Sequence, residues 1–123
     1  MAHAIIPNTG AMTDFIGAFD VPSKLTDKIY RCRFSHMWNA IATRHADTID
    51  TKFWVDGQTT VVGLAHLAFA AFRERTGRSL TDREASYVAA EYLRERLQEE
   101  DEHETYNVPQ SDVERIITRL GIN

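Results

Sequence analysis

Cysteine is almost missing from this 123-residue chain, and its one copy, Cys32, excludes an internal disulfide. No apolar run reaches the roughly 18 residues that a membrane span needs, because Arg73 interrupts the best candidate. The first residues also lack the basic start and apolar core of a signal peptide. These absences predict a protein of the reducing cytoplasm that does not enter a membrane.

An excess of basic charge is also missing. Fourteen Lys and Arg residues face eighteen Asp and Glu residues, for a formal net charge of −4. Proteins that coat nucleic acid depend on cations that meet phosphates, so this balance argues against nucleic acid as a partner. The apolar fraction of 43% and the length predict a single compact domain over residues 1–123, with residues 1–10 as an arm.

Residues 61–75 have the strongest pattern in the chain. Val61, Leu64 and Phe72 lie on one stripe of a helix, and most residues between them are also apolar. A helix that is apolar nearly all round has to be buried by its neighbours. The pattern therefore predicts a central buried helix, in which His66 is the one polar side chain among the first twelve residues.

Two helices are expected before this segment. A short one fits residues 13–19, and a long one fits residues 24–46, where apolar side chains recur at helical spacing. The recurring side chains of the long helix are Tyr30, Phe34, Met37 and Ile41.

Two more helices are expected after it. Gly77 suits the left-handed position that ends the central helix. Thr81 and Glu84 have the spacing of a capping box, and helical periodicity continues over residues 82–97. A second capping-box spacing predicts a short final helix over residues 111–120.

Between residues 51 and 62 the pattern changes from helical to extended. Asp56 and Gly57 suit a type I′ turn between two strands, and with a two-residue turn Trp54 faces Thr59. The sequence as a whole predicts a mainly α fold of α+β character. Its four to five helices surround the central helix, and one β-hairpin lies at about residues 51–62.

His66 is the first residue to consider for chemistry, because an imidazole titrates near neutrality. One interpretation makes His66 a general acid or base, supported by His36, in an apolar pocket walled by Trp38 and Trp54. The other makes it a buried histidine whose ring nitrogens are hydrogen-bonded locally, as buried polar groups require. We favour the second interpretation.

Cys32 and His36 are spaced to share one face of the predicted helix. With His66 they offer three metal ligands, and as a pair they offer a nucleophile and its base. No Cys-x-x-Cys or His-Glu-x-x-His motif is present, and a single cysteine between apolar neighbours is more often packing material. The sequence therefore predicts no metal and no cofactor.

Four arginines, which we call the arginine corner, cluster around the turn after the central helix. They are Arg73, Arg75, Arg78 and Arg83. The corner suits phosphate or an acidic protein surface, but it equally suits helix-end electrostatics, with Glu74 and Asp82 as partners. The second interpretation is favoured.

The absence of a catalytic motif favours a small non-enzymatic binding or regulatory protein. We expect it to act as a homodimer, or with another protein, through the hairpin edge. The predicted contact surface joins Phe53, Trp54 and Val55 to the arginine corner. One alternative is a small enzyme or ligand-binding domain that uses His66 as acid or base. A further alternative is nucleic-acid binding through the arginine corner.

Overall fold

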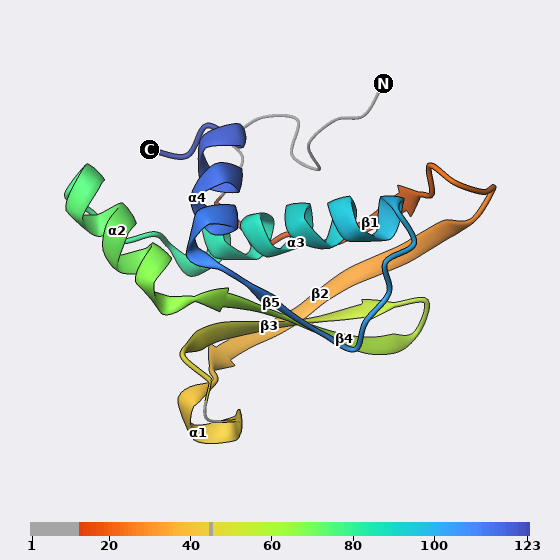
Figure 1. Cartoon of the computed structure of the whole chain (residues 1–123), viewed down its shortest axis with the longest axis horizontal. Coiled ribbons are helices and arrows are strands. Elements are labelled where there is room, and N and C mark those ends of the chain that lie inside the picture. The colour runs from red at the N-terminus through yellow and green to blue at the C-terminus, as the bar shows by residue number, and fades with distance from the viewer. Residues whose placement is uncertain (1–12, 45) are drawn as a thin grey trace.

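A computed structural model of the chain describes residues 13–44 and 46–123. Within those residues, a five-stranded mixed sheet and four helices form the fold, and the longer helices α2, α3 and α4 lie on one side of the sheet (Figure 1). The short helix α1 lies on the other side. The fold is therefore α+β with a central sheet, and the prediction of a mainly α fold around a central helix is wrong.

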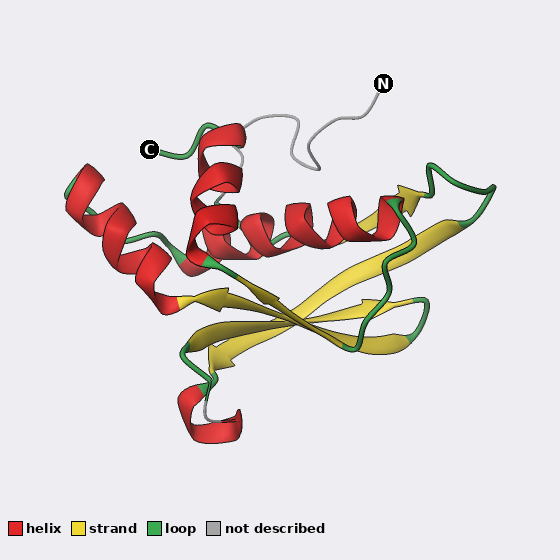
Figure 2. Ribbon diagram, in the orientation of Figure 1, coloured by secondary structure: helices red, strands yellow, loops and turns green. Residues whose placement is uncertain are grey.

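The strands lie in the order β1-β2-β3-β4-β5 across the sheet, and β5 runs parallel to β4 while the other pairs are antiparallel (Figure 2). A parallel pair needs a long crossover, which α2 and α3 supply. The strands are β1 Ala18–Pro22, β2 Ile29–Asn39, β3 Thr48–Val55, β4 Gln58–Ala65 and β5 Thr105–Val108. The helices are α1 Ile41–Arg44, α2 His66–Thr76, α3 Asp82–Gln98 and α4 Gln110–Arg119.

The long helix predicted over residues 24–46 is wrong, because β2 occupies most of this segment. Tyr30 and Cys32 are buried on alternate positions of the strand, as period-two packing requires. A β-bulge at Ser35 then inserts one extra residue between Phe34 and the next inward side chain, Met37. The bulge therefore produces a three-residue gap that resembles helical spacing.

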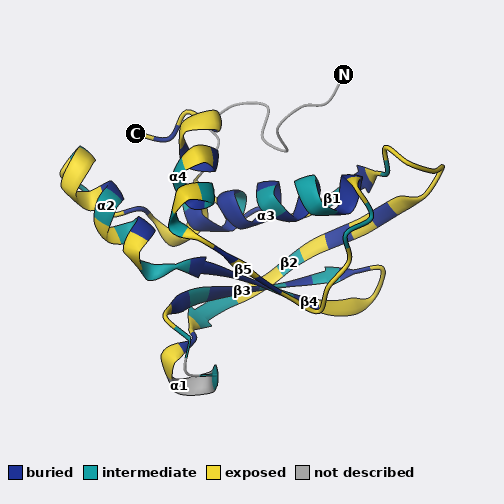
Figure 3. Ribbon diagram, viewed as in Figure 1, coloured by how far each residue is buried: buried dark blue, intermediate teal, exposed yellow. Residues whose placement is uncertain are grey.

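The central helix predicted over residues 61–75 is also wrong. The first part of this segment is β4, an inner strand, and the second part is α2. Only Ala68 and Phe72 of α2 are buried, and Leu67 is 62% exposed. Figure 3 shows α2 with long exposed stretches, in contrast to α3. Because the apolar strand β4 is followed directly by the helix α2, the sequence pattern resembles that of one helix that is apolar on all sides.

Several local predictions are confirmed. Asp56 and Gly57 both have positive φ angles, 51° and 79°, and Trp54 pairs with Thr59. Gly77 ends α2 in the left-handed conformation, and the Thr81–Glu84 capping box begins α3. These features depend on short-range geometry, so the sequence is sufficient to predict them.

The chain ends differ from expectation. Residues 13–17 form a turn and irregular backbone in place of the short helix, and residues 1–10, the predicted arm, lie outside the described residues. β5 was not predicted. Ser111 lies inside α4, whose N-cap is Pro109 without a side-chain cap, so the second capping box is wrong.

The hydrophobic core fills the space between the sheet and the helices α3 and α4. Its largest fully buried side chains come from both layers, and Figure 3 shows α3 dark blue where it faces the sheet. They include Tyr30, Phe53 and Leu64 from the sheet and Leu93, Ile116 and Ile117 from the helices. In the described residues, none of the helices has the length and apolar content to cross a membrane.

Candidate functional site

The sheet face opposite α2, α3 and α4, which we call the open face, is built around β2 and β3. On β2, Arg31 and Arg33 are exposed while the residues that alternate with them are buried. The bulge at Ser35 shifts this alternation by one residue. Beyond it, His36 and Trp38 therefore join the arginines on the open face.

Three successive cross-strand rows bring rings and charged groups together on this face. β3 contributes Asp50, Lys52 and Trp54, which alternate with core residues. We call the rows the open-face ladder, and the register defines them as Arg33–Trp54, His36–Lys52 and Trp38–Asp50.

The rings and cations of the ladder touch one another. The Lys52 ammonium lies 4.6 Å from the centroid of the Trp54 ring, a cation–π contact. The His36 and Trp38 ring centroids are 5.0 Å apart, with an angle of 35° between the planes. The ladder therefore presents aromatic surface next to positive charge.

Positive charge is in excess on the strands of the open face. Arg33 and Lys52 have no ion pair among the described residues, and Arg31 has only a long contact of 3.8 Å with Asp20. Both side chains of that contact are largely exposed, so water screens it strongly. The second carboxylate that the register places here, Asp50, is fully buried and enclosed by Arg44.

Arg44 of α1 closes one end of the open face. Its Nε donates to Asp50 Oδ2 at 2.7 Å, and its Nη2 donates to Asp50 Oδ1 and to Asn107 Oδ1, both at 2.8 Å. The hydrogen bond to Asp50 raises the pKa of the Arg44 guanidinium, so the guanidinium stays charged. These bonds span β3, β4 and β5, and they hold α1 against the sheet.

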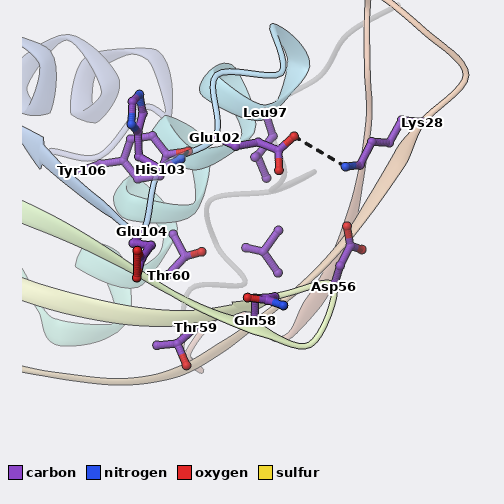
Figure 4. A pocket seen from close by; sticks show the side chains of 11 residues that line it. Lys28, Asp56, Gln58, Thr59, Thr60, Leu97, Glu102, His103, Glu104 and Tyr106 are labelled. Atoms are coloured by element: carbon purple, nitrogen blue, oxygen red, sulfur yellow. Dashed lines mark hydrogen bonds and ion pairs between the residues drawn. The ribbon is translucent and has the colours of Figure 1, made fainter.

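A hollow of about 440 Å³ lies beside the hairpin turn on the helix side of the sheet (Figure 4). Asp56, Glu102 and Glu104 line it, and Lys28 is paired with Glu102 at 3.5 Å. The Tyr30 hydroxyl donates to the same carboxylate at 2.6 Å; burial and this acidic partner raise the Tyr30 pKa. This hollow repels anions, in contrast to the open face.

The two histidines proposed for catalysis do not line a common hollow among those described. His66 begins α2, half-buried, and its Nε2 is 3.1 Å from the Asn39 amide nitrogen. The amide nitrogen is a donor, so this local contact can satisfy the ring nitrogen from within the chain. His36 lies on the open face, where its Nδ1 is 3.0 Å from the Ser35 hydroxyl.

Cys32 and His36 point to opposite faces of the sheet, because the bulge separates them. Burial, together with the charges of Asp56 and Asp20, raises the pKa of the Cys32 thiol to about 12. The thiol is therefore protonated at neutral pH and has no base beside it. Within residues 13–44 and 46–123, no three metal-ligating side chains gather in one place.

In the arginine corner, contacts within the chain occupy the side chains. Arg78 forms two hydrogen bonds with Glu84, at 2.9 and 2.8 Å, and Arg73 donates to Ser79. Arg75 and Arg83 lie over the rings of Phe72 and Phe15. Among the described residues, the acidic partner of the corner is thus Glu84, and not Glu74 or Asp82 as expected from the sequence.

The remaining predicted site residues divide between the two faces of β3 and β2. Phe53 and Val55 are buried in the core, so they present no surface to a partner. Trp54 and Trp38 are half-buried on the open face, in the outer rows of the ladder.

The cations of the ladder were not among the predicted site residues. Arg31 and Arg33 alternate with the core residues Tyr30, Cys32 and Phe34, and this period-two pattern is the signal that could have found them.

Comparisons of the chain with protein-family models, with curated proteins and with solved structures find no match. Function therefore has to be inferred from the site alone.

Proposed function

We propose that this chain is a non-enzymatic binding protein that holds single-stranded nucleic acid on its open face. The observation that carries the proposal is the alternation of rings and cations in the open-face ladder. Proteins that bind single strands combine a cationic track for the backbone with aromatic rings on which bases stack.

The ladder supports this ligand over other anions. An acidic peptide would match the charge of Arg31, Arg33 and Lys52, but it would leave the two tryptophan rings without stacking partners. A duplex keeps its base faces inside the helical stack, whereas an unpaired strand exposes them. The rings and cations together favour an unpaired strand.

The net charge of −4 does not oppose this ligand, because the charges are segregated. The acidic hollow of Asp56, Glu102 and Glu104 lies on the helix side of the sheet, whereas the exposed strand charges of the open face are mostly basic. Local potential governs where an anion binds. The net charge of the whole chain does not describe this distribution, so it does not exclude nucleic acid as a ligand.

Most of the strand edge of the hairpin is already paired among the described residues, because β3 pairs with β2 and residues 61–64 of β4 pair with β5. Two open faces in contact would set cations such as Arg33 and Lys52 near their own copies, which is unfavourable across paired surfaces. The cationic face therefore favours an anionic polymer over a second copy.

Fluorescence anisotropy of a short labelled oligothymidylate or oligouridylate tests the proposal. We expect binding at low salt, with log affinity against log salt falling at a slope of roughly −2 if three cations meet phosphates. A double variant, Arg31→Glu with Arg33→Glu, should lose most of the affinity. The matched control makes the same charge change in the arginine corner, Arg75→Glu with Arg83→Glu, and should retain it.

Two results would overturn the proposal. One is no binding of either oligonucleotide by the wild type at low salt. The other is an equal loss in both double variants, which would mean that total charge and not the open face determines the affinity.

A further inference from the structure

A second hollow lies on the open face, next to Trp54. It has a volume of about 520 Å³, and its lining includes Ala18, Arg31, Arg33, Trp54 and Gly57. The register places Ala18, Arg33 and Trp54 side by side on β1, β2 and β3. Two of its lining residues, Ala18 and Gly57, have a small side chain or none.

Two features lie beside Trp54, namely the Lys52 ammonium and the hollow. Lys52, two residues earlier on β3, holds its ammonium over the ring, 4.6 Å from the centroid. The hollow lies toward the hairpin turn, where Gly57 stands. Trp54 therefore lines this hollow together with the two arginines of β2.

The surroundings of Trp38 are different. Its ring contacts His36 at 5.0 Å, and its row ends at the buried Asp50 with its Arg44 partner. Among the hollows described here, Trp54 lines one and Trp38 lines none.

The lining fits one planar group with a negative charge beside it. An aromatic ring next to an apolar space suits a stacked base, and two guanidinium groups at the rim suit phosphate, which they bind with paired donors. Arg31 and Arg33 are both exposed, so their guanidinium groups are accessible to a ligand.

We infer that this hollow seats one unpaired base of the bound strand, stacked on Trp54, with the flanking phosphates on Arg31 and Arg33. The inference rests on the proposed function and adds to it a binding site for one base, which we call the seat. The ligand class is a nucleotide within a single strand.

Tryptophan fluorescence tests the seat directly, because the chain has only two tryptophans. Trp38→Phe leaves Trp54 as the sole reporter, and Trp54→Phe leaves Trp38. On titration with unlabelled oligothymidylate, we expect strong quenching in the first variant and little in the second.

Affinity measurements on variants of the hollow complete the test. Trp54→Ala should lose roughly 5- to 150-fold in affinity, the range for one lost stacking contact. Ala18→Leu should fill the hollow and weaken binding with Trp54 intact. Thr105→Leu, at an exposed position of β5, is the matched control and should bind as the wild type does. Thermal unfolding of each variant checks that it is folded.

The outcomes separate the two proposals. If the wild type binds the oligonucleotide but Trp54 emission is unchanged and Ala18→Leu binds normally, the seat is wrong and the proposed function stands. If the wild type does not bind at all, the proposed function fails, and the seat fails with it.

Discussion

Gly63 lies where an α1 side chain crosses the middle of the sheet. A Cβ at this position would be 2.6 Å from both Arg44 Nη2 and Asp50 Oδ1, and 3.1 Å from the Thr48 hydroxyl. Because β4 has no side chain here, the guanidinium reaches across it to Asp50 and to Asn107 on β5. Glycine in an inner strand usually weakens it, and here close approach of a side chain requires it.

Gly63→Ala should therefore lower the free energy of unfolding. The added methyl forces Arg44 away and leaves the buried Asp50 carboxylate without its partner, at a cost of about 2–4 kcal/mol. Gly17→Ala is the matched control, because nothing lies within 4 Å of a Cβ there. Urea titrations at pH 7 compare the two variants, and an equal effect in both would contradict this assignment of Gly63.

Cys32 should make the protein sensitive to alkaline pH. Burial raises the pKa of its thiol from 9.0 to about 12 in the folded state, so its contribution to stability is complete below about pH 9. That contribution is lost as the pH rises from 9 toward 12, while the unfolded chain ionises. The pKa of Tyr106, which burial raises to about 12, adds loss in the same direction.

Urea titrations at pH 8 and at pH 10.5 measure this effect, and Cys32→Ala should show a smaller decline than the wild type. Iodoacetamide at pH 8 should label the folded protein far more slowly than the protein in urea. Equal labelling rates in the two states would show that the thiol is not buried as described.

Among the elements, β2 shows most clearly why the fold was only partly predictable. In a strand with one bulge, the alternation of inward and outward side chains shifts by one residue at the bulge. The resulting three-residue spacing from Phe34 to Met37 across Ser35 resembles helical periodicity. The alternation over residues 30–34 is a local signal of the strand, but pairing between strands distant in sequence decides where the bulge lies. The hairpin turn and the start of α3 were predictable because their geometry is set within four residues.

The start of α3 should depend on its capping box. The Thr81 hydroxyl accepts from the Glu84 backbone N–H at 3.1 Å, and the Glu84 carboxylate accepts from the Thr81 N–H at 3.0 Å. Thr81→Ala should cost about 1 kcal/mol. Thr118→Ala, at an exposed position within α4, is the control and should be neutral or slightly stabilising. Thermal unfolding measures both, and equal melting temperatures would contradict a capping role.

At the scale of the molecule, one face of the sheet is packed against α2, α3 and α4, and the other, the open face, carries cations and aromatic rings. The sequence offered Trp38 and Trp54 as pocket walls only under the alternative of a small enzyme or ligand-binding domain, and the structure places both half-buried on the open face. Arg31 and Arg33 were not predicted as site residues, because a helix over residues 24–46 does not place them beside both tryptophan rings. Only the sheet, with its bulge, brings the cations and rings to one face.

Chemical-shift mapping of the backbone amides during titration with oligothymidylate tests this open-face binding surface most directly. We predict that the largest changes cluster on β2 and β3, around residues 31–38 and 52–54, with little change in α3 and α4. Changes centred on the arginine corner or on the acidic hollow, with β2 and β3 unaffected, would contradict it.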